Sequence, residues 1–341
     1  MSKNRTNLRW GLIGASDIAE TRMIPAINVQ PDSVVHSIVS GSAGYAEAYA
    51  KKNSIPHAYH RLGAFLADPD LDVVYISSRN EKHREQALAS FEAGKPVLCE
   101  KPLALNLADA RAMVDVAAGN RLVFGTNHHL RAAVTHRTLR RLIQEGAIGQ
   151  PLGVQVCNAT YLAPRLQGWR LDCASAGGGV IMDLTVHDVD IIHFVLGLCG
   201  EEVMAQCASQ GLGQNGLEDS VMGVIKFEGN ILGQFYDSFV TRYASTGVEI
   251  HGTEGSLVAT DVMKQDPIGR IVLCHNAERR EISAGRPEDL YAVTVRRFNE
   301  AVRGTGEPVA TGEDGAKSLA VALAVSESIK TGRRTKIRYD A

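Results

Sequence analysis

The 341-residue sequence lacks long apolar runs, a signal-sequence pattern and an excess of charge of either sign. Its most apolar stretch, Ile191 to Gly200, contains His193 and falls well short of the roughly 18 residues that a membrane span needs. Residues 1–10 are polar and show no apolar signal core, so we expect a cytoplasmic protein. The 36 lysines and arginines nearly balance the 38 aspartates and glutamates, which predicts no binding to nucleic acid or to an anionic membrane.

The six cysteines are widely spaced and form no Cys-x-x-Cys pair. A chain of this length can bury a large core without disulfides, so we expect reduced thiols and no structural zinc site. Glycine, by contrast, is abundant: 33 residues, about a tenth of the chain, against a usual ~7%. Many of these glycines fall beside the motifs described below.

The first 125 residues alternate strand and helix patterns with short connections. We expect strands at Leu8–Ile13, Val34–Val39, Leu71–Ile76, Pro96–Cys99 and Leu122–Phe124, and helices ending near Val29 and at Ala43–Lys52, Lys82–Ala93 and Leu107–Ala118. Such alternation predicts parallel strands joined by right-handed crossovers. Residues 1–127 are therefore interpreted as a doubly wound, Rossmann-type NAD(P)-binding domain in an α/β protein.

The pattern changes after Asn127. We expect helices at Ala132–Glu145 and Asp314–Lys330, a strand at Leu152–Tyr161, and two hairpins formed by Ser220–Phe227 with Ile231–Val240 and Val248–His251 with Ser256–Ala259. Residues 128–341 are therefore interpreted as a substrate-binding α+β domain with a large, open, mainly antiparallel sheet. A partly apolar free face of such a sheet could serve as a homodimer surface.

A dinucleotide-binding pattern follows the first expected strand. Gly14, Ser16, Asp17, Ile18 and Ala19 fit the Gly-x-Gly-x-x-Gly/Ala frame, with serine in the second place. Glycine allows the tight turn, and the following helix directs its free N–H groups at a pyrophosphate. The hydroxyl of Ser16 could bond a phosphate oxygen. An ordinary strand–helix turn is the alternative, and the alternating sheet around it favours nucleotide binding.

The end of the second strand bears on the choice of cofactor. NAD-specific sites usually place a carboxylate there for the ribose 2′-hydroxyl, whereas this chain has Val39 followed by Ser40, Gly41 and Ser42. Two hydroxyls and a helix N-terminus would accept a 2′-phosphate, so we expect NADP(H) to be preferred. Because no arginine lies between residues 40 and 50, NAD(H) remains possible.

Two segments carry candidate catalytic residues. Lys101 follows Glu100 at the end of a parallel strand, where side chains face the ligand crevice, although a lysine alone would be unremarkable on a surface. Pro102 leaves the Lys101–Pro102 bond either cis or trans. After a run of three glycines, Asp183, His187 and Asp190 are spaced to share a helix face, so a carboxylate one turn away could orient the imidazole for proton transfer. A core histidine or, less favoured, a metal site are the alternatives.

Taken in order along the chain, these motifs resemble the Gfo/Idh/MocA family of oxidoreductases. The segments that carry the resemblance are residues 14–19, 78–83, 100–102, 177–190 and 251–255. The resemblance implies catalytic roles for Lys101, Asp183 and His187. The cofactor residues that we expect besides the phosphate turn are Ser40, Ser42, Ser78, Asn80, His83, Glu100 and Lys101, and the expected substrate residues are Lys101, Asn127, His128, Trp169, Arg170, Asp183 and His187.

The runs at residues 125–131 and 166–170 further resemble family members that reduce a ketone of a sugar derivative with NADPH. We therefore expect hydride transfer to a sugar carbonyl with proton donation by Lys101 or His187, and no metal. One departure is Tyr45, which stands where such a reductase has an arginine. A sugar or inositol dehydrogenase is the nearest alternative, and a non-catalytic NAD(P)-binding regulator is the second.

Overall fold

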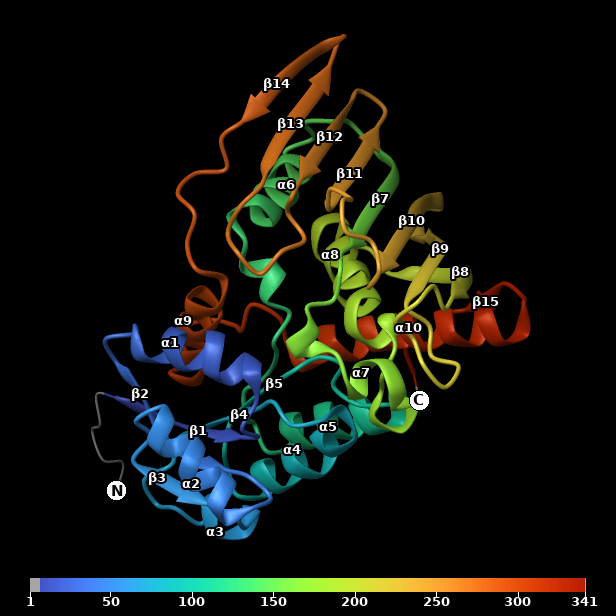
Figure 1. Cartoon of the computed structure of the whole chain (residues 1–341). Helices are drawn as coiled ribbons and strands as arrows, with labels where there is room; N and C mark the ends of the chain where they lie inside the picture. Colours follow the sequence, from blue (N-terminus) through green and yellow to red (C-terminus); the bar gives the residue numbers. More distant parts are fainter. Residues whose placement is uncertain (1–6, 341) are drawn as a thin grey trace. The chain divides into compact units, whose positions relative to one another are not determined.

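The computed structural model describes residues 7–340, which form two compact units (Figure 1). Unit 1 consists of residues 7–129 and 291–315, and unit 2 of residues 130–290 and 316–340. The first unit corresponds to the expected Rossmann domain with one addition. Residues 291–315 come from the part of the chain that the sequence pattern assigned to the second domain.

Unit 1 is built on a six-stranded parallel sheet with the strand order β3-β2-β1-β4-β5-β6. Its strands are β1 (Leu8–Ile13), β2 (Ser33–Val39), β3 (His57–Tyr59), β4 (Val73–Ile76), β5 (Val97–Cys99) and β6 (Phe124–Thr126). The order reverses between β1 and β4, and ligands of such sheets bind beside the carboxyl ends of the strands at that point. The doubly wound sheet predicted from the sequence is confirmed, with the last strand two residues later than expected.

The helices of unit 1 follow the expected alternation with local differences. They are α1 (Ile24–Asn28), preceded by the π-helical turn η1 (Ala19–Met23), then α2 (Ala43–Lys52), α3 (Leu62–Leu66), α4 (His83–Glu92) and α5 (Leu107–Gly119). The sequence pattern missed β3 and α3, since both are short and two of the three β3 residues are exposed. Segments of three and five residues are too short to show a recognisable strand or helix periodicity.

Helix α9 (Leu290–Val302) returns the chain to unit 1. The rings of Phe298 and Trp10 pack with their centroids 5.3 Å apart, and both side chains are fully buried. Beyond the helix, Ala310 accepts a hydrogen bond from the Thr126 N–H at 3.0 Å, next to the last strand of the parallel sheet. The apolar face of α9 is buried against residues of unit 1, such as Trp10, that lie some 290 residues earlier in the chain. A domain boundary read along the sequence could not reveal this return.

Unit 2 contains a nine-stranded sheet in the order β14-β13-β12-β11-β7-β10-β9-β8-β15. Its strands are β7 (Pro151–Ala159), β8 (Gly200–Ala208), β9 (Ser220–Phe227), β10 (Ile231–Ser238), β11 (Gly247–Gly252), β12 (Gly255–Thr260), β13 (Arg270–His275), β14 (Glu278–Ile282) and β15 (Thr335–Lys336). The pair β7–β10 is parallel and the other pairs are antiparallel. Both expected hairpins, β9–β10 and β11–β12, are confirmed.

One face of this sheet is covered by helices. The helices of unit 2 are α6 (Val134–Gln144), α7 (Trp169–Asp172), the π-helical turn η6 (Ile181–Thr185), α8 (Val186–Leu196) and α10 (Gly312–Thr331), which begins in unit 1. Helix α8 packs on β7, and α6 packs on α8 and β13. Along β9 and β10, inward residues such as Ile225 and Phe235 are buried, whereas Met222, Val224 and Leu232 are about half exposed. No helix within residues 7–340 is long and apolar enough to cross a membrane.

Candidate functional site

The expected phosphate-binding turn lies at the carboxyl end of β1, where the sheet order reverses. Gly14 has a φ of +104°, and a Cβ at this position would lie 2.8 Å from the backbone nitrogen of Ser78, which follows β4. Any side chain here would therefore collide with the neighbouring loop as well as strain the backbone. The geometry explains why this turn carries glycine, and it suits a dinucleotide cofactor.

Ser16 is engaged within the protein. Its Oγ accepts a hydrogen bond from the Ala19 N–H at 3.1 Å, and its hydroxyl donates to the Oγ of Ser77 at 2.7 Å. The hydroxyl thus links the start of the first helix to the end of β4. The sequence suggests that this hydroxyl could bond a phosphate oxygen, and in this structure it contacts Ser77 and Ala19.

Two tyrosines of α2 contact the same turn. The Tyr49 hydroxyl donates to the carbonyl oxygen of Ser16 at 3.0 Å, and burial raises the pKa of Tyr49, which keeps the donor proton in place. Tyr45, 56% exposed, reaches the carbonyl oxygen of Ala15 at 3.4 Å. The sequence pattern did not single out Tyr49. Its spacing of four residues from Tyr45 on one helix was the available signal.

The second strand ends beside this turn with no acidic side chain between Val39 and Ser42. The main chain is held here because the Ser40 N–H donates to the carbonyl oxygen of Tyr59 at 3.2 Å, and the Gly14 N–H donates to that of Val39 at 3.0 Å. Ser42 is exposed immediately before α2. Residues 39–42 thus contain two serine hydroxyls and no carboxylate.

The motif with the candidate catalytic lysine follows β5, and its Lys101–Pro102 bond is cis. The carboxylate of Glu100 accepts two short hydrogen bonds at Oε1, from the Tyr75 hydroxyl and from Asn127 Nδ2, both at 2.6 Å. Burial raises the pKa of Glu100, while Tyr75, Lys101 and Asn127 favour its ionised form. Asn127, expected among the substrate residues, is fully buried and holds Glu100 in place.

His83, expected among the cofactor residues, joins two loops at this edge of the sheet. It is fully buried, with Nδ1 2.9 Å from the carbonyl oxygen of Pro102 and Nε2 3.1 Å from that of Ser78. Burial lowers the pKa of His83. The ring therefore ties the loop after β4 to the loop that carries Lys101. Asn80 and His128 are also buried in unit 1.

The candidate residues of unit 2 gather around η6 and α7. Arg170 Nε lies 3.5 Å from Asp183 Oδ2, and the Arg170 guanidinium lies 4.7 Å from the centre of the Trp169 ring. The structure thus brings together three residues that the sequence placed in the substrate set. Gly179, which lies just before η6, has a φ of +102°, and a Cβ there would meet the carboxylate of Glu218.

His187 lies in the first turn of α8 and is 7% exposed. Asp190, which the spacing placed on the same helix face, is buried and accepts two hydrogen bonds from Arg131, Nε to Oδ2 at 2.9 Å and Nη2 to Oδ1 at 2.7 Å. That aspartate therefore belongs to a buried ion pair within unit 2. Within residues 7–340, no group of three or more histidine, cysteine or acidic side chains is arranged to hold a metal ion.

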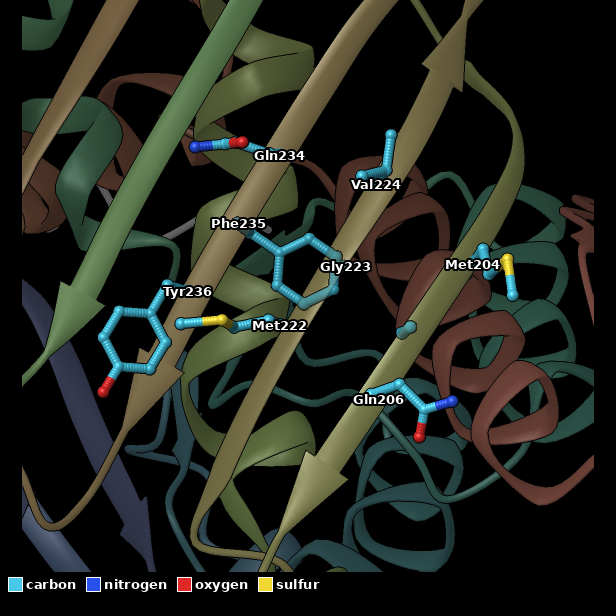
Figure 2. A pocket seen from close by; sticks show the side chains of 9 residues that line it. Met204, Gln206, Met222, Gly223, Val224, Gln234, Phe235 and Tyr236 are labelled. Atoms are coloured by element: carbon cyan, nitrogen blue, oxygen red, sulfur yellow. The ribbon is translucent and has the colours of Figure 1, made fainter. Parts of the chain in front are cut away.

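A separate hollow of about 350 Å³ lies on the sheet of unit 2 (Figure 2). It is formed by neighbouring residues of β8, β9 and β10, namely Met204, Ala205, Gln206, Met222, Gly223, Val224, Gln234, Phe235 and Tyr236. None of these residues belongs to the expected cofactor or substrate sets. The hollow is therefore a feature of the sheet surface, distinct from the candidate site.

Comparison with known proteins adds independent information on this chain. Residues 8–128 match the family model described as "Oxidoreductase family, NAD-binding Rossmann fold", and residues 136–258 match that of the "GFO/IDH/MocA C-terminal domain". A 1,5-anhydro-D-fructose reductase from Ensifer adhaerens is 49% identical over 96% of this chain and 98% of its own. A myo-inositol 2-dehydrogenase from Thermotoga maritima is 26% identical over 97% of this chain and 98% of its own.

Solved structures show the same fold. A levoglucosan dehydrogenase in complex with NADH and levoglucosan superposes with a TM-score of 0.87 at 22% identity, covering 98% of this chain and 100% of that one. An aldose–aldose oxidoreductase from Caulobacter crescentus superposes with a TM-score of 0.88 at 21% identity, and the match covers 97% of this chain and 99% of that one. At these identities the likeness concerns the fold.

Proposed function

The chain belongs to the Gfo/Idh/MocA family of oxidoreductases, and from this premise we propose that it reduces 1,5-anhydro-D-fructose to 1,5-anhydro-D-mannitol with NADPH. The observation that carries the proposal is the 49% identity, over nearly the full length of both chains, with an enzyme of that name. The retention of Lys101, Asp183 and His187 in their motifs supports catalysis over a binding role.

NADPH is favoured by the end of β2. The residues that would hold the cofactor are Gly14, Ser16, Asp17, Ile18, Ala19, Ser40, Ser42, Ser78, Asn80, His83, Glu100 and Lys101. A carboxylate beside a 2′-phosphate would repel it, and residues 39–42 contain none. The comparison of kcat/KM for NADPH and NADH tests this preference. Ser42→Asp should shift the ratio toward NADH, and an unchanged ratio would contradict the assignment of Ser42.

When bound, the nicotinamide cofactor supplies the hydride. The protein must then protonate the oxygen of the substrate carbonyl, and we assign that proton to Lys101 with His187 as its relay. General acid catalysis of this kind contributes about 10²–10⁴-fold. Lys101→Ala should lower kcat by at least about 100-fold, with a much smaller effect on the Kd for NADPH, whereas Lys51→Ala, at an exposed position of α2, should leave both unchanged. Unchanged turnover in Lys101→Ala would end the assignment.

The immediate donor is identified by pH profiles of two variants. If Lys101 donates directly, His187→Asn retains a reduced rate with an altered pH dependence, while Lys101→Ala is inactive at every pH. The opposite pattern assigns direct donation to His187. Asp183→Asn tests whether this carboxylate orients the imidazole of His187. The substitution also weakens the contact between Asp183 and Arg170. We expect an effect on kcat that exceeds the effect on the KM for NADPH.

The second candidate function is the oxidation of a sugar or an inositol with NAD(P)⁺, which the likeness to the myo-inositol dehydrogenase favours. The acid of reduction is the base of oxidation, so the same residues would serve. Parallel assays with 1,5-anhydro-D-fructose plus NADPH and with myo-inositol or glucose plus NAD⁺ separate the two. A non-catalytic regulator would instead bind NADP tightly without turnover on this panel.

We also propose a cytoplasmic location and a homodimer formed through the open face of the unit 2 sheet. Met204, Met222 and Leu232 are each more than half exposed on that face, which is apolar enough to favour association. Light scattering tests the dimer, with Met222→Asp as the variant that should dissociate it. A wild-type mass of one chain would contradict the proposal.

A further inference from the structure

Two carboxyl groups lie buried at the centre of unit 2. Asp188 belongs to the first turn of α8 and Asp237 to β10, and both side chains are fully buried. Neither residue belongs to the cofactor, substrate or catalytic sets described above. Two acids enclosed together are costly unless their charges are removed or compensated, so the arrangement calls for a physical explanation.

The contacts of the two carboxyls connect three elements. Asp237 Oδ2 accepts a hydrogen bond from the Thr185 hydroxyl at 2.5 Å, and Asp188 Oδ1 accepts one from Asn158 Nδ2, on β7, at 2.9 Å. The remaining oxygens, Asp188 Oδ2 and Asp237 Oδ1, are buried and accept no hydrogen bond from another group of the described residues, and the Asp237 charge helps to raise the pKa of Asp188. Because an ionised carboxylate can only accept, a proton held between the two carboxyls would satisfy both oxygens.

The pair keeps one proton at neutral pH. Burial raises the pKa of Asp237 to about 6, and burial beside the Asp237 charge raises the pKa of Asp188 well above its usual range. The groups that face the pair are Thr185, Asn158 and Cys157, and burial raises the pKa of the Cys157 thiol, which stays neutral. The two carboxyls therefore share this one proton.

These contacts surround His187 along the chain. Thr185 precedes it by two residues and Asp188 follows it directly, and both side chains bond the same carboxyl of Asp237. We propose that Asp188 and Asp237, by sharing one proton, are positioning residues that fix the turn carrying His187 on the sheet. The inference rests on the proposed function in so far as it takes His187 to be catalytic.

A shared proton fixes this turn more specifically than apolar packing would. Hydrogen bonds are directional, and they hold the junction of η6 and α8 at one rotation against β10. Loss of the proton would leave two enclosed negative charges in contact, which repel each other. The anchoring of His187 should accordingly weaken as pH rises through the pKa of Asp188.

The test compares Asp188→Asn with Asp188→Leu, with Asp289→Asn at an exposed position of unit 2 as the control. The asparagine amide can donate to Asp237 and accept from Asn158 as the protonated acid does, whereas leucine removes both bonds. At pH 7 we expect Asp188→Asn to keep kcat within about threefold of wild type. Asp188→Leu should lower kcat at least about tenfold with an unchanged KM for NADPH.

Unfolding by urea at pH 5 to 9 tests the shared proton independently of turnover. Between the ordinary aspartate pKa and the raised one, the native wild type holds a proton that the unfolded chain has lost. As pH rises through this range, the folding equilibrium constant of the wild type should therefore fall about tenfold per pH unit relative to that of Asp188→Asn. If the stabilities of the wild type and Asp188→Asn depended on pH in the same way, the shared proton would be ruled out, whatever the turnover assays give.

The proton NMR titration of His187 tests positioning without relying on activity. His187→Asn assigns the resonance among the 11 histidines. We expect Asp188→Leu to shift that resonance and its titration, and Asp188→Asn to preserve them. An unchanged His187 resonance in Asp188→Leu would overturn the positioning role. Failure of the proposed function would appear differently, as full activity of His187→Asn or as wild-type inactivity on 1,5-anhydro-D-fructose.

Discussion

Replacement of Tyr75 by phenylalanine probes the hydrogen bonds that hold Glu100 beside Lys101. Tyr75 is fully buried in β4, and its hydroxyl lies 2.6 Å from Glu100 Oε1. Burial raises the pKa of Tyr75 well above its usual range, so the hydroxyl donates throughout the accessible pH range. Phenylalanine keeps the ring and its packing, so the substitution removes the hydrogen bond without leaving a large cavity.

The expected cost depends on the charge of Glu100. A hydrogen bond to an ionised group contributes about 1.5–3 kcal/mol, and one between neutral groups about 0.5–1.5 kcal/mol. Tyr75→Phe should therefore lower the free energy of unfolding by about 2 kcal/mol at a pH above the raised pKa of Glu100, where the carboxylate is ionised. At lower pH Glu100 takes up its proton earlier than an exposed glutamate, because its pKa is raised, and the cost should fall to about 1 kcal/mol.

Fluorescence can report on unit 1 alone. The chain has two tryptophans, Trp10 buried in unit 1 and Trp169 in unit 2, so a Trp169→Phe background leaves an indole in unit 1 only. Urea unfolding at pH 5 and pH 8 then gives the stability of that unit. Tyr243→Phe, at a position that is 96% exposed, is the matched control and should cost nothing measurable.

Two results would refute the reasoning. If Tyr75→Phe were as stable as Tyr243→Phe, the bond to Glu100 would contribute nothing to unit 1. If the cost did not fall as pH is lowered through the acid range, protonation of Glu100 would not weaken this hydrogen bond, and the effects of burial and hydrogen bonding on its pKa would be wrongly assigned.

Three further substitutions test other parts of the structure. Asp190→Asn should destabilise unit 2 by about 3 kcal/mol in urea unfolding, since it leaves Arg131 buried without its countercharge; a loss below about 1 kcal/mol would contradict this. Asp219→Asn should lower stability at pH 7, and this loss should shrink as pH falls through the lowered pKa of Asp219, because backbone N–H donors hold that pKa below its usual range and their stabilisation disappears when the carboxylate is protonated. Gly14→Ala should weaken NADPH binding at least about tenfold by calorimetry, while Gly63→Ala, where a Cβ meets no atom within 4 Å, should not.

Local patterns predicted much of unit 1. The helix at Ala43–Lys52 was placed at its exact bounds, and the parallel sheet followed from the alternation of short apolar runs with helices. The glycine turn after β1 was also recognisable, because its motif lies within residues 14–19 and the positive φ of Gly14 is a local property of the backbone. These features depend on residues that are neighbours in sequence.

Patterns also predicted which residue types gather in unit 2, but not all of their partners. Trp169, Arg170 and Asp183 lie together as expected of one set. Asp190 was placed on a helix face with His187, yet its charge is compensated by Arg131, which lies 59 residues earlier. Spacing along a helix specifies which face of the helix a side chain lies on. The group that the side chain contacts belongs to another element, and the spacing does not identify it.

The sequence by itself determined the fold class, the phosphate turn and the motif positions of Lys101, Asp183 and His187, because each depends on short-range periodicity and local backbone geometry. Only the tertiary structure decided the return of α9 to unit 1, the engagement of Ser16 with Ser77, and the pairing of Asp188 with Asp237. Each of these joins segments that are distant in the chain. The protonation state of a buried acid is set by its three-dimensional surroundings, which no local pattern contains.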